Sequence, residues 1–200
     1  MMRLLHVGCG PKRKDRTTPG FNNDGWEETR LDIDPAVQPD VTGTMTDMSA
    51  VEKGSMDAVF SSHNIEHLYP HEVPVALAEF HRVLNAQGIV VITCPDIQSV
   101  AVLVADDKLT EPAYQSAAGP ISPIDMMYGH RAAMARGNLF MAHRCAFTRR
   151  VLEGTLRVAG FPGVISRARP GHFDLWALGS KSVRSEEELR LLARQHFPAA

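Results

Sequence analysis

The sequence has few cysteines, no long apolar run and almost no surplus of either charge. Its three cysteines, Cys9, Cys94 and Cys145, lie far apart and lack the spacing of a disulfide framework or a zinc finger. We therefore expect reduced thiols and a cytoplasmic location. No segment approaches the roughly 18 consecutive apolar residues of a membrane span, and the run before Gly8 is too short for a signal peptide. We expect no membrane partner.

Charge and size narrow the class of protein further. A formal net charge of -2 in 200 residues leaves no broad basic surface, so we expect no nucleic-acid partner. The content of 44% hydrophobic and 22% charged residues is that of an ordinary globular chain, and the length suits one buried core better than two. We predict a single domain over residues 1–200.

A short apolar run, Leu4 to Val7, ends at two glycines separated by one residue, Gly8 and Gly10. Such a run is typical of a buried parallel strand followed by a tight turn. In a doubly wound α/β sheet this turn lies at the carboxyl edge, where glycine lets a nucleoside-bearing ligand contact the main chain. The turn predicts a ligand site, although two glycines at this spacing also occur by chance.

Asp32 ends a second apolar-flanked segment about twenty residues further on. In nucleotide-binding α/β units, an acid at this place accepts hydrogen bonds from the two ribose hydroxyls. The alternative is that Asp32 and Asp34 are ordinary turn acids, because Asp before Pro favours turns. The glycine turn upstream favours the ribose role. A dinucleotide is disfavoured, since Arg13 stands where the third glycine should be and Pro11 intervenes.

Three later segments extend this pattern. Residues 55–68 contain an Asp-led apolar strand, a short polar turn and Glu66-His67-Leu68, while residues 80–84 are typical of a helix and residues 88–92 of a buried strand. With the glycine turn and Asp32, they resemble the class I S-adenosylmethionine-dependent methyltransferase superfamily, in a small type-11-like form with a shortened first helix. The resemblance covers residues 3–95 well and residues 143–180 in outline.

The resemblance implies a fold, a cofactor and a reaction. The fold is α/β, with a Rossmann-like, doubly wound, mostly parallel seven-stranded sheet and an antiparallel C-terminal hairpin. The cofactor is S-adenosyl-L-methionine, and the product formed from it is S-adenosyl-L-homocysteine. The reaction is methyl transfer, for which we expect a small-molecule acceptor.

The resemblance also assigns residues to the cofactor. Asp47 would accept a hydrogen bond from the adenine amino group and Met48 would pack on the ring, the alternative being a helix-capping Asp beside a core Met. His63 and Asn64 follow the fourth predicted strand, where they would line the methionine side of the cofactor or the methyl acceptor. The full predicted set is Gly8, Cys9, Gly10, Asp32, Ile33, Asp47, Met48, His63 and Asn64.

His63, Glu66 and His67 match the H-x-x-E-H pattern of inverted zinc peptidases. That chemistry requires both histidines on one face of a helix. His63 instead follows an apolar strand directly, and a zinc site would leave the glycine turn unexplained, so we expect no metal. Glu66 near a helix start is also favoured by the helix dipole, and a structural role for His67 is the alternative to a chemical one.

Two segments depart from the resemblance. Between Gly10 and Asp32, where the superfamily places a full helix, the chain is polar and rich in helix-breaking residues. Which residues cover the methionine end of the cofactor stays an open question, and Trp26 is one candidate. Residues 96–144 form an irregular excursion, with a helix expected over 99–107, which we interpret as a lid or insertion. A homodimer contact would have the same composition. The candidate substrate-binding residues are Tyr128, His130, Arg131, His143 and Arg144.

The C-terminal part completes the expected fold. Ser185 and Glu188 form a capping box that predicts a helix to Phe197, and residues 164–168 and 173–179 predict the closing hairpin. Thr148 should cap an earlier helix that Gly160 ends. The residues of that helix expected to face inward are Val151, Leu152, Thr155, Val158 and Ala159.

Methyl transfer from a sulfonium is an in-line displacement in which positioning dominates. A hydroxyl acceptor would need a general base, for which His63, His130 and His143 have suitable intrinsic pKa values. An amine acceptor would leave all three dispensable. Two other functions stay open. One is a noncatalytic S-adenosylmethionine-binding sensor or partner module, and the other, with less support, is a zinc hydrolase built on His63, Glu66 and His67.

Overall fold

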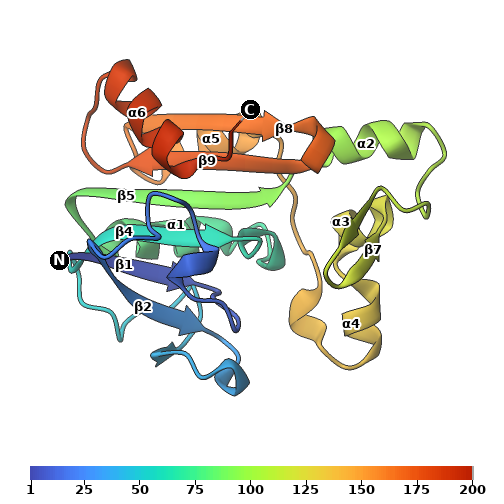
Figure 1. Ribbon diagram of the computed structural model, residues 1–200, viewed down its shortest axis with the longest axis horizontal. Coiled ribbons are helices and arrows are strands. Elements are labelled where there is room, and N and C mark those ends of the chain that lie inside the picture. Colours follow the sequence, from blue (N-terminus) through green and yellow to red (C-terminus); the bar gives the residue numbers. More distant parts are fainter. Residues whose placement is uncertain (200) are drawn as a thin grey trace.

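The computed structural model, which describes residues 1–199, is built around one seven-stranded sheet of order β3-β2-β1-β4-β5-β9-β8 (Figure 1). The first five strands are parallel, and β9 runs antiparallel to both β5 and β8. The predicted mostly parallel sheet with its antiparallel C-terminal hairpin is confirmed. The strands are β1 (Met2–Val7), β2 (Trp26–Asp32), β3 (Val41–Thr42), β4 (Met56–Ser62), β5 (Leu84–Pro95), β8 (Gly163–Arg169) and β9 (Asp174–Ser180).

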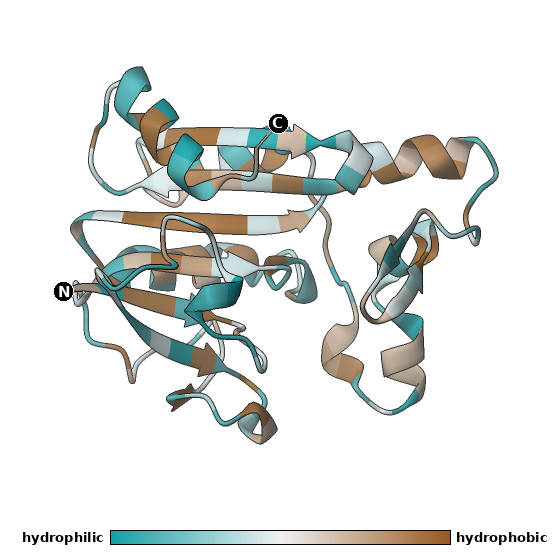
Figure 2. Ribbon diagram, in the orientation of Figure 1, coloured by the Kyte–Doolittle hydropathy of each residue, from teal (hydrophilic) through white to brown (hydrophobic). Residues whose placement is uncertain are grey.

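The central strands are buried on both faces, which is why they are runs of apolar residues rather than alternating ones. Figure 2 shows β1 and β5 as hydrophobic over much of their length. One face is covered by α1 (Val73–Val83) and α5 (Arg149–Val158), whose Leu77, Phe80 and Leu152 belong to the larger core cluster. The other face is covered by α6 (Glu186–His196), through Leu189 and Ala193. The helices cover the two faces of the sheet and hold the carboxyl ends of the parallel strands in place.

The segment between β1 and β2 holds one 3-10 turn, Lys14–Arg16, in place of a full first helix. Phe21 from this segment is completely buried and packs on Trp26 and His196. The backbone N–H of Gly20 donates to the carbonyl of Gln195 at 3.0 Å, so α6 fills the space that a first helix would take. Trp26 starts β2, at the opposite edge from Gly8, so the suggestion that it covers the cofactor was wrong.

Residues 96–144, here called the insertion, lie beside the carboxyl edge of the sheet (Figure 1). The helix expected over 99–107 is α2 (Ile97–Ala105). A small core of Val100, Ile121 and Met126 holds these pieces together. The other elements are β6 (Tyr114–Ser116), β7 (Gly119–Ile121), α3 (Pro123–Tyr128), α4 (Arg131–Ala135) and a 3-10 turn at Leu139–Met141.

The α5 helix has the predicted ends but a different buried face. Thr148 Oγ1 accepts from the N–H of Val151 at 3.4 Å, and Gly160 at φ +96° follows the helix. Val151 and Val158, predicted to face inward, are 51% and 89% exposed, because Leu152 and Leu156, one turn apart, define the stripe on the sheet. Sequence reasoning overlooked Leu156.

The predicted capping box of α6 is present: Ser185 Oγ accepts from the N–H of Glu188, and the Glu188 carboxylate accepts from the N–H of Ser185 at 2.7 Å. Of the closing hairpin, β8 extends one residue beyond its predicted range at each end, and β9 is shifted by one residue from the predicted 173–179. Among the described residues, every helix is too short or too polar to cross a membrane.

Candidate active site

The turn after β1 requires glycine for two different reasons. Gly8 and Gly10 have φ values of +64° and +53°, in the left-handed region where other residues are strained. A Cβ at Gly8 would also overlap the side-chain amide of Asn64, whereas a Cβ at Gly10 would meet open space. The Asn64 amide donates to the carbonyls of Val7 at 3.1 Å and Ser62 at 2.9 Å. Asn64 therefore fastens the end of β1 to the end of β4.

Asp32 lies beside this turn at the end of β2 and is 8% exposed. Its carboxylate accepts from the N–H of Gly10 at 2.7 Å and from the N–H of Asp34 at 2.9 Å. A carboxylate has about four acceptor positions, so two remain for a ligand. Asp34, in contrast, accepts from the N–H of Ala36 at 2.9 Å and is an ordinary turn acid.

Sequence reasoning missed Arg30, whose guanidinium supports the glycine turn from below. Arg30 is buried, and it donates to the carbonyls of Gly10 at 2.6 Å, Gln38 at 2.8 Å and Lys12 at 3.1 Å. A charged residue near the end of a strand buried on both faces is the signal that could have identified it.

A hollow of about 180 Å³, here called the turn cavity, opens at this edge. The ends of β1 and β2 and the turns after β3 and β4 form its floor, and the insertion closes it with Phe140, Met141 and Arg144. Of the residues assigned to the cofactor, Gly8, Asp32, Ile33 and Asn64 line it. The other lining residues are Val7, Leu31, Gly43, Thr44, Met45, His67 and Leu68.

Asp47 and Met48 do not line the turn cavity, so its geometry gives no support to the adenine role predicted for them. Thr44 pairs with Asp47 in a tight turn directly after β3, which brings Thr44 and Met45, three residues earlier, to the cavity wall. The exposed Asp47 accepts from the N–H of Ser49, and this bonding lowers its pKa. Met48 is buried in the core. The turn-acid and core-methionine alternative fits both residues.

Cys9 and Gly10 contribute to the turn cavity indirectly. The Cys9 thiol is buried beside the turn, and burial raises its pKa to about 11, so it is an unreactive packing group. Gly10 lies outside the lining and acts through its N–H bond to Asp32.

A second hollow of about 590 Å³, here called the histidine cavity, adjoins the first, because His67 and Met141 line both. Its walls come from the turn after β4, the insertion and the loop between β8 and β9. The polar and aromatic side chains that line it include His63, Glu66, His67, Tyr114, Asp125, His130, His143, Arg169, His172, Phe173 and Asp174.

Two of the five substrate-binding candidates, His130 and His143, line the histidine cavity. Tyr128 is exposed and outside the lining, because α3 turns its ring outward. Arg131 is bound to Asp125 at 2.7 Å, and Arg144 lines the turn cavity instead while its guanidinium stacks over Tyr69.

Asp125 and its ion pair with Arg131 organise the insertion. Burial opposes ionisation, but hydrogen bonds from Arg131 and Ser122 outweigh burial and hold the pKa of Asp125 far below its ordinary range. Its carboxylate also accepts from the Ser122 hydroxyl at 2.6 Å. Arg131 is thus a positioning residue of the cavity wall.

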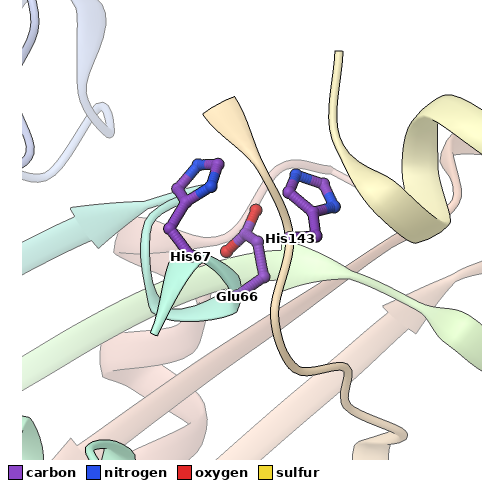
Figure 3. Close-up of side chains that lie close together, drawn as sticks. All are labelled: Glu66, His67 and His143. Atoms are coloured by element: carbon purple, nitrogen blue, oxygen red, sulfur yellow. The ribbon is translucent and has the colours of Figure 1, made fainter. Parts of the chain in front are cut away.

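A buried carboxylate lies at the centre of the histidine side chains. Glu66, in the 3-10 turn Ile65–His67, is 1% exposed, and neither of its carboxylate oxygens has a hydrogen-bond partner among the described residues. Ligand atoms of Glu66, His67 and His143 lie within 4.8 Å of one another. Figure 3 shows the carboxylate pointing between the two imidazole rings.

His63 faces the same carboxylate from the other side, with its Nδ1 at 3.4 Å from a Glu66 oxygen and its ring half exposed. Burial would lower the pKa of His63, but Glu66 outweighs it and raises that pKa. Burial lowers the pKa of His143 in spite of Glu66. Burial would raise the pKa of Glu66, but His63, then His67 and His143, hold it below its ordinary value. The carboxylate is therefore ionised at neutral pH.

The helical H-x-x-E-H arrangement is not formed. His63 has φ +54° and precedes a single 3-10 turn, so His63 and His67 do not share a helix face. The third group beside Glu66 and His67 is His143, which the sequence placed among the acceptor residues.

Comparison with known proteins agrees with this geometry. A family model described as a methyltransferase domain matches residues 5–92. The search of curated proteins found no match to the chain.

Several solved structures share the fold. The 1,6-didemethyltoxoflavin-N1-methyltransferase of Burkholderia thailandensis, solved with bound 1,6-didemethyltoxoflavin and S-adenosylhomocysteine, is 17% identical, and 90% of this chain covers 71% of that chain with a TM-score of 0.57. An S-adenosylmethionine-dependent methyltransferase from Archaeoglobus fulgidus is 14% identical, with coverages of 90% and 86% and a TM-score of 0.58. A protein from Pyrococcus horikoshii is 13% identical, with coverages of 89% and 81% and a TM-score of 0.60.

At such identities the structural likeness shows the fold, and the family match covers the strands and turns that build the turn cavity. Residues 5–92 match the methyltransferase-domain family, and the fold of the chain is that of class I S-adenosylmethionine-dependent methyltransferases.

Proposed function

We propose that this protein transfers a methyl group from S-adenosylmethionine to a small-molecule acceptor held in the histidine cavity. The observation that carries the proposal is the arrangement of two adjoining cavities that share His67 and Met141. One lies at the carboxyl edge of the parallel strands and holds a free pair of carboxylate acceptor positions on Asp32. The other holds the histidines.

The residues of the turn cavity fit a nucleoside-bearing cofactor. Asp32 has the acceptor positions that two ribose hydroxyls need, and Leu31, Ile33 and Met45 provide apolar walls for a base. When bound, S-adenosylmethionine supplies an electrophilic methyl group on its sulfonium.

The insertion acts as a lid in this proposal. Small-molecule sites usually enclose about 300 to 1,000 Å³, and the turn cavity at about 180 Å³ is below that range. Phe140 and Met141 narrow it, and Phe140 is half exposed, so its displacement costs little buried area. Opening and closing of Leu139–Met141 would admit the cofactor and then exclude water.

The histidine cavity suits a small polar acceptor. Its volume of about 590 Å³ lies within the usual range for small ligands, and aromatic rings such as Tyr114 and Phe173 lie beside polar groups. The Burkholderia structure, which holds bound 1,6-didemethyltoxoflavin, supports a small molecule as the class of acceptor.

Positioning is the main contribution that this site has to make, since in-line displacement needs no protein nucleophile. His63, His130 and His143 face the acceptor and could accept a proton from a hydroxyl. An amine acceptor would donate its lone pair without a base, so the proposal assigns no single base. The three free cysteines agree with a reducing compartment such as the cytoplasm.

Calorimetry with S-adenosylmethionine and S-adenosylhomocysteine tests the first half of the proposal, and we expect saturable binding of both. Incorporation of a labelled methyl group from the cofactor into a metabolite extract tests the second half. Binding without incorporation would favour a sensor or partner module, and absence of binding would contradict the proposed function altogether.

A further inference from the structure

We propose that Glu66, His67 and His143 form a binding site for one divalent transition-metal ion, such as Zn²⁺, where the turn cavity and the histidine cavity meet. The H-x-x-E-H pattern does not form this site by itself, because His63 and His67 do not share a helix face. The fold creates a different set by adding a histidine 76 positions after His67.

The first argument is the isolation of the Glu66 carboxylate. A carboxyl group that is almost fully buried is costly to the fold unless it is paired and hydrogen-bonded. Both oxygens of Glu66 lack a hydrogen-bond partner among the described residues, and the half-exposed ring of His63 approaches one of them only to 3.4 Å. A divalent cation supplies the missing charge and coordination.

The second argument is the orientation of the two histidines. Nδ1 of His67 lies 3.0 Å from the carbonyl oxygen of Ala142, and Nδ1 of His143 lies 2.8 Å from that of Met126. A carbonyl oxygen can only accept, so both Nδ1 atoms carry the proton and both Nε2 atoms have a free lone pair. Metal-binding histidines usually donate their other ring N–H to a carbonyl or carboxylate oxygen in this way.

The third argument is that the backbone already joins the two pieces of the site. The carbonyl of Glu66 accepts from the N–H groups of Arg144 at 2.8 Å and Cys145 at 3.2 Å. The Arg144 guanidinium donates to the carbonyl of His67 at 2.6 Å. These bonds hold the irregular segment that carries His143 against the turn that carries Glu66, and Figure 3 shows the two lying side by side.

The distances require only a small contraction. Ligand atoms at about 2.0 to 2.2 Å from zinc lie roughly 3.3 Å from one another. The three ligand atoms here are separated by up to 4.8 Å, so rotation of the imidazole rings, whose centroids are 5.0 Å apart, has to bring them about 1.5 Å closer at most.

The donor set indicates the kind of metal and leaves room for a further ligand. Two imidazoles and one carboxylate suit zinc and its first-row neighbours, and three protein ligands leave a coordination position open. All three ligands line the histidine cavity, so a metal held there would be accessible to an acceptor oxygen and would lower the pKa of that oxygen. This catalytic role depends on the proposed function, whereas metal binding does not.

The test uses the full chain after treatment with a chelator. Titration with Co²⁺ should give visible absorption bands that saturate at one equivalent, and Zn²⁺ should abolish them by displacement. Calorimetry with S-adenosylhomocysteine on the same metal-free protein tests the proposed function separately. Saturable cobalt bands without cofactor binding would support the metal site and contradict the proposed function.

Glu66→Gln and His143→Gln should each weaken Zn²⁺ binding by roughly 100-fold or more, because loss of a metal ligand costs more affinity than loss of a residue that only orients a ligand. His172→Gln is the matched control, since His172 lines the same cavity outside the cluster, and it should bind Zn²⁺ as the parent does. An unchanged melting temperature would show that a variant is folded. If His143→Gln does not fold, Glu66→Gln, which keeps the shape of the side chain, still tests the site. Failure of the folded parent to bind Zn²⁺ or Co²⁺ stoichiometrically, or full binding by folded Glu66→Gln, would overturn the inference.

Discussion

The turn cavity and the histidine cavity lie side by side, yet they are built in different ways. The floor of the turn cavity consists of strand ends held in fixed register, with Val7 paired to Leu31 on one side and to Ser61 on the other. Most of the wall of the histidine cavity comes from the insertion and from the loop between β8 and β9. Sheet register positions the first set of side chains, whereas a few local hydrogen bonds position the second.

This difference predicts where the molecule is rigid and where it can change. A strand end cannot move without breaking its ladder, but the insertion rests on a small core and on Asp125. Regions with few buried apolar contacts open at lower free energy than the core. The following experiments, in order of decreasing expected effect, test the contrast between the two regions.

Gly8→Ala should have the largest effect and Gly10→Ala is its matched control. Both substitutions place a side chain in the left-handed region, which costs about 1 to 2 kcal/mol. At Gly8 the added methyl also displaces Asn64 and its bonds, so we expect a total loss of about 3 to 5 kcal/mol in the free energy of unfolding. Chemical denaturation of both variants measures this. Equal losses would show that Asn64 does not hold the strand ends together.

Asp32→Asn should weaken binding of S-adenosylhomocysteine by about 100-fold, since hydrogen bonds to a charged group contribute about 1.5 to 3 kcal/mol. Asp34→Asn is the control, because Asp34 bonds only its own turn among the described residues, and its affinity should stay within about twofold. Calorimetry measures both affinities. Equal affinities for the two variants would rule out the ribose role of Asp32.

Asp125→Asn should loosen the insertion and leave the sheet intact. The charge on Asp125 holds Arg131 and the Ser122 hydroxyl, so its loss should speed proteolytic cleavage within residues 96–144 by roughly tenfold. Asp106→Asn, which removes an exposed carboxylate of the same insertion, should have little effect. Mass spectrometry of the fragments locates the cuts. Faster cleavage within the strands instead would contradict the independence of the two regions.

Acidification should weaken the sheet layer through His196. Burial depresses the pKa of His196 to about 4 in the folded protein, below its ordinary 6.5, so the unfolded chain binds more protons between these values. The contribution of neutral His196 to the free energy of unfolding is therefore present above pH 6.5 and is lost as the pH falls toward 4. The loss between pH 7.5 and 5.5 is about 1.3 kcal/mol. Denaturation at both pH values, with parent and His196→Gln, isolates this contribution. An identical pH dependence in the two proteins would show that His196 does not cause it.

The sequence predicted the parts of the molecule that the sheet determines. Strand runs, glycine turns and capping residues are local signals, so Gly8, Asp32 and the Ser185 box could be placed without coordinates. The residues after β3 were harder to place, because β3 has only two residues and gives no periodicity by which to count. Thr44 and Met45, which line the turn cavity, lie three positions before the predicted Asp47 and Met48.

The environment of Glu66 could not be predicted in the same way. Its neighbours include His143, and the contact depends on how the insertion returns to the turn after β4. No spacing in the sequence encodes that return, because it results from tertiary hydrogen bonds between segments far apart in the chain. The same holds for Arg30, whose four carbonyl partners come from two loops.

The packing of Phe21 against His196 has a consequence for synthesis of the protein. Phe21 and Trp26 emerge early from the ribosome, but the helix that covers them is made more than 150 residues later. Until then, an apolar face of the parallel sheet stays open to water and to other nascent chains. We expect this protein to complete its fold only after translation of α6, and to be vulnerable to aggregation while that helix is still missing.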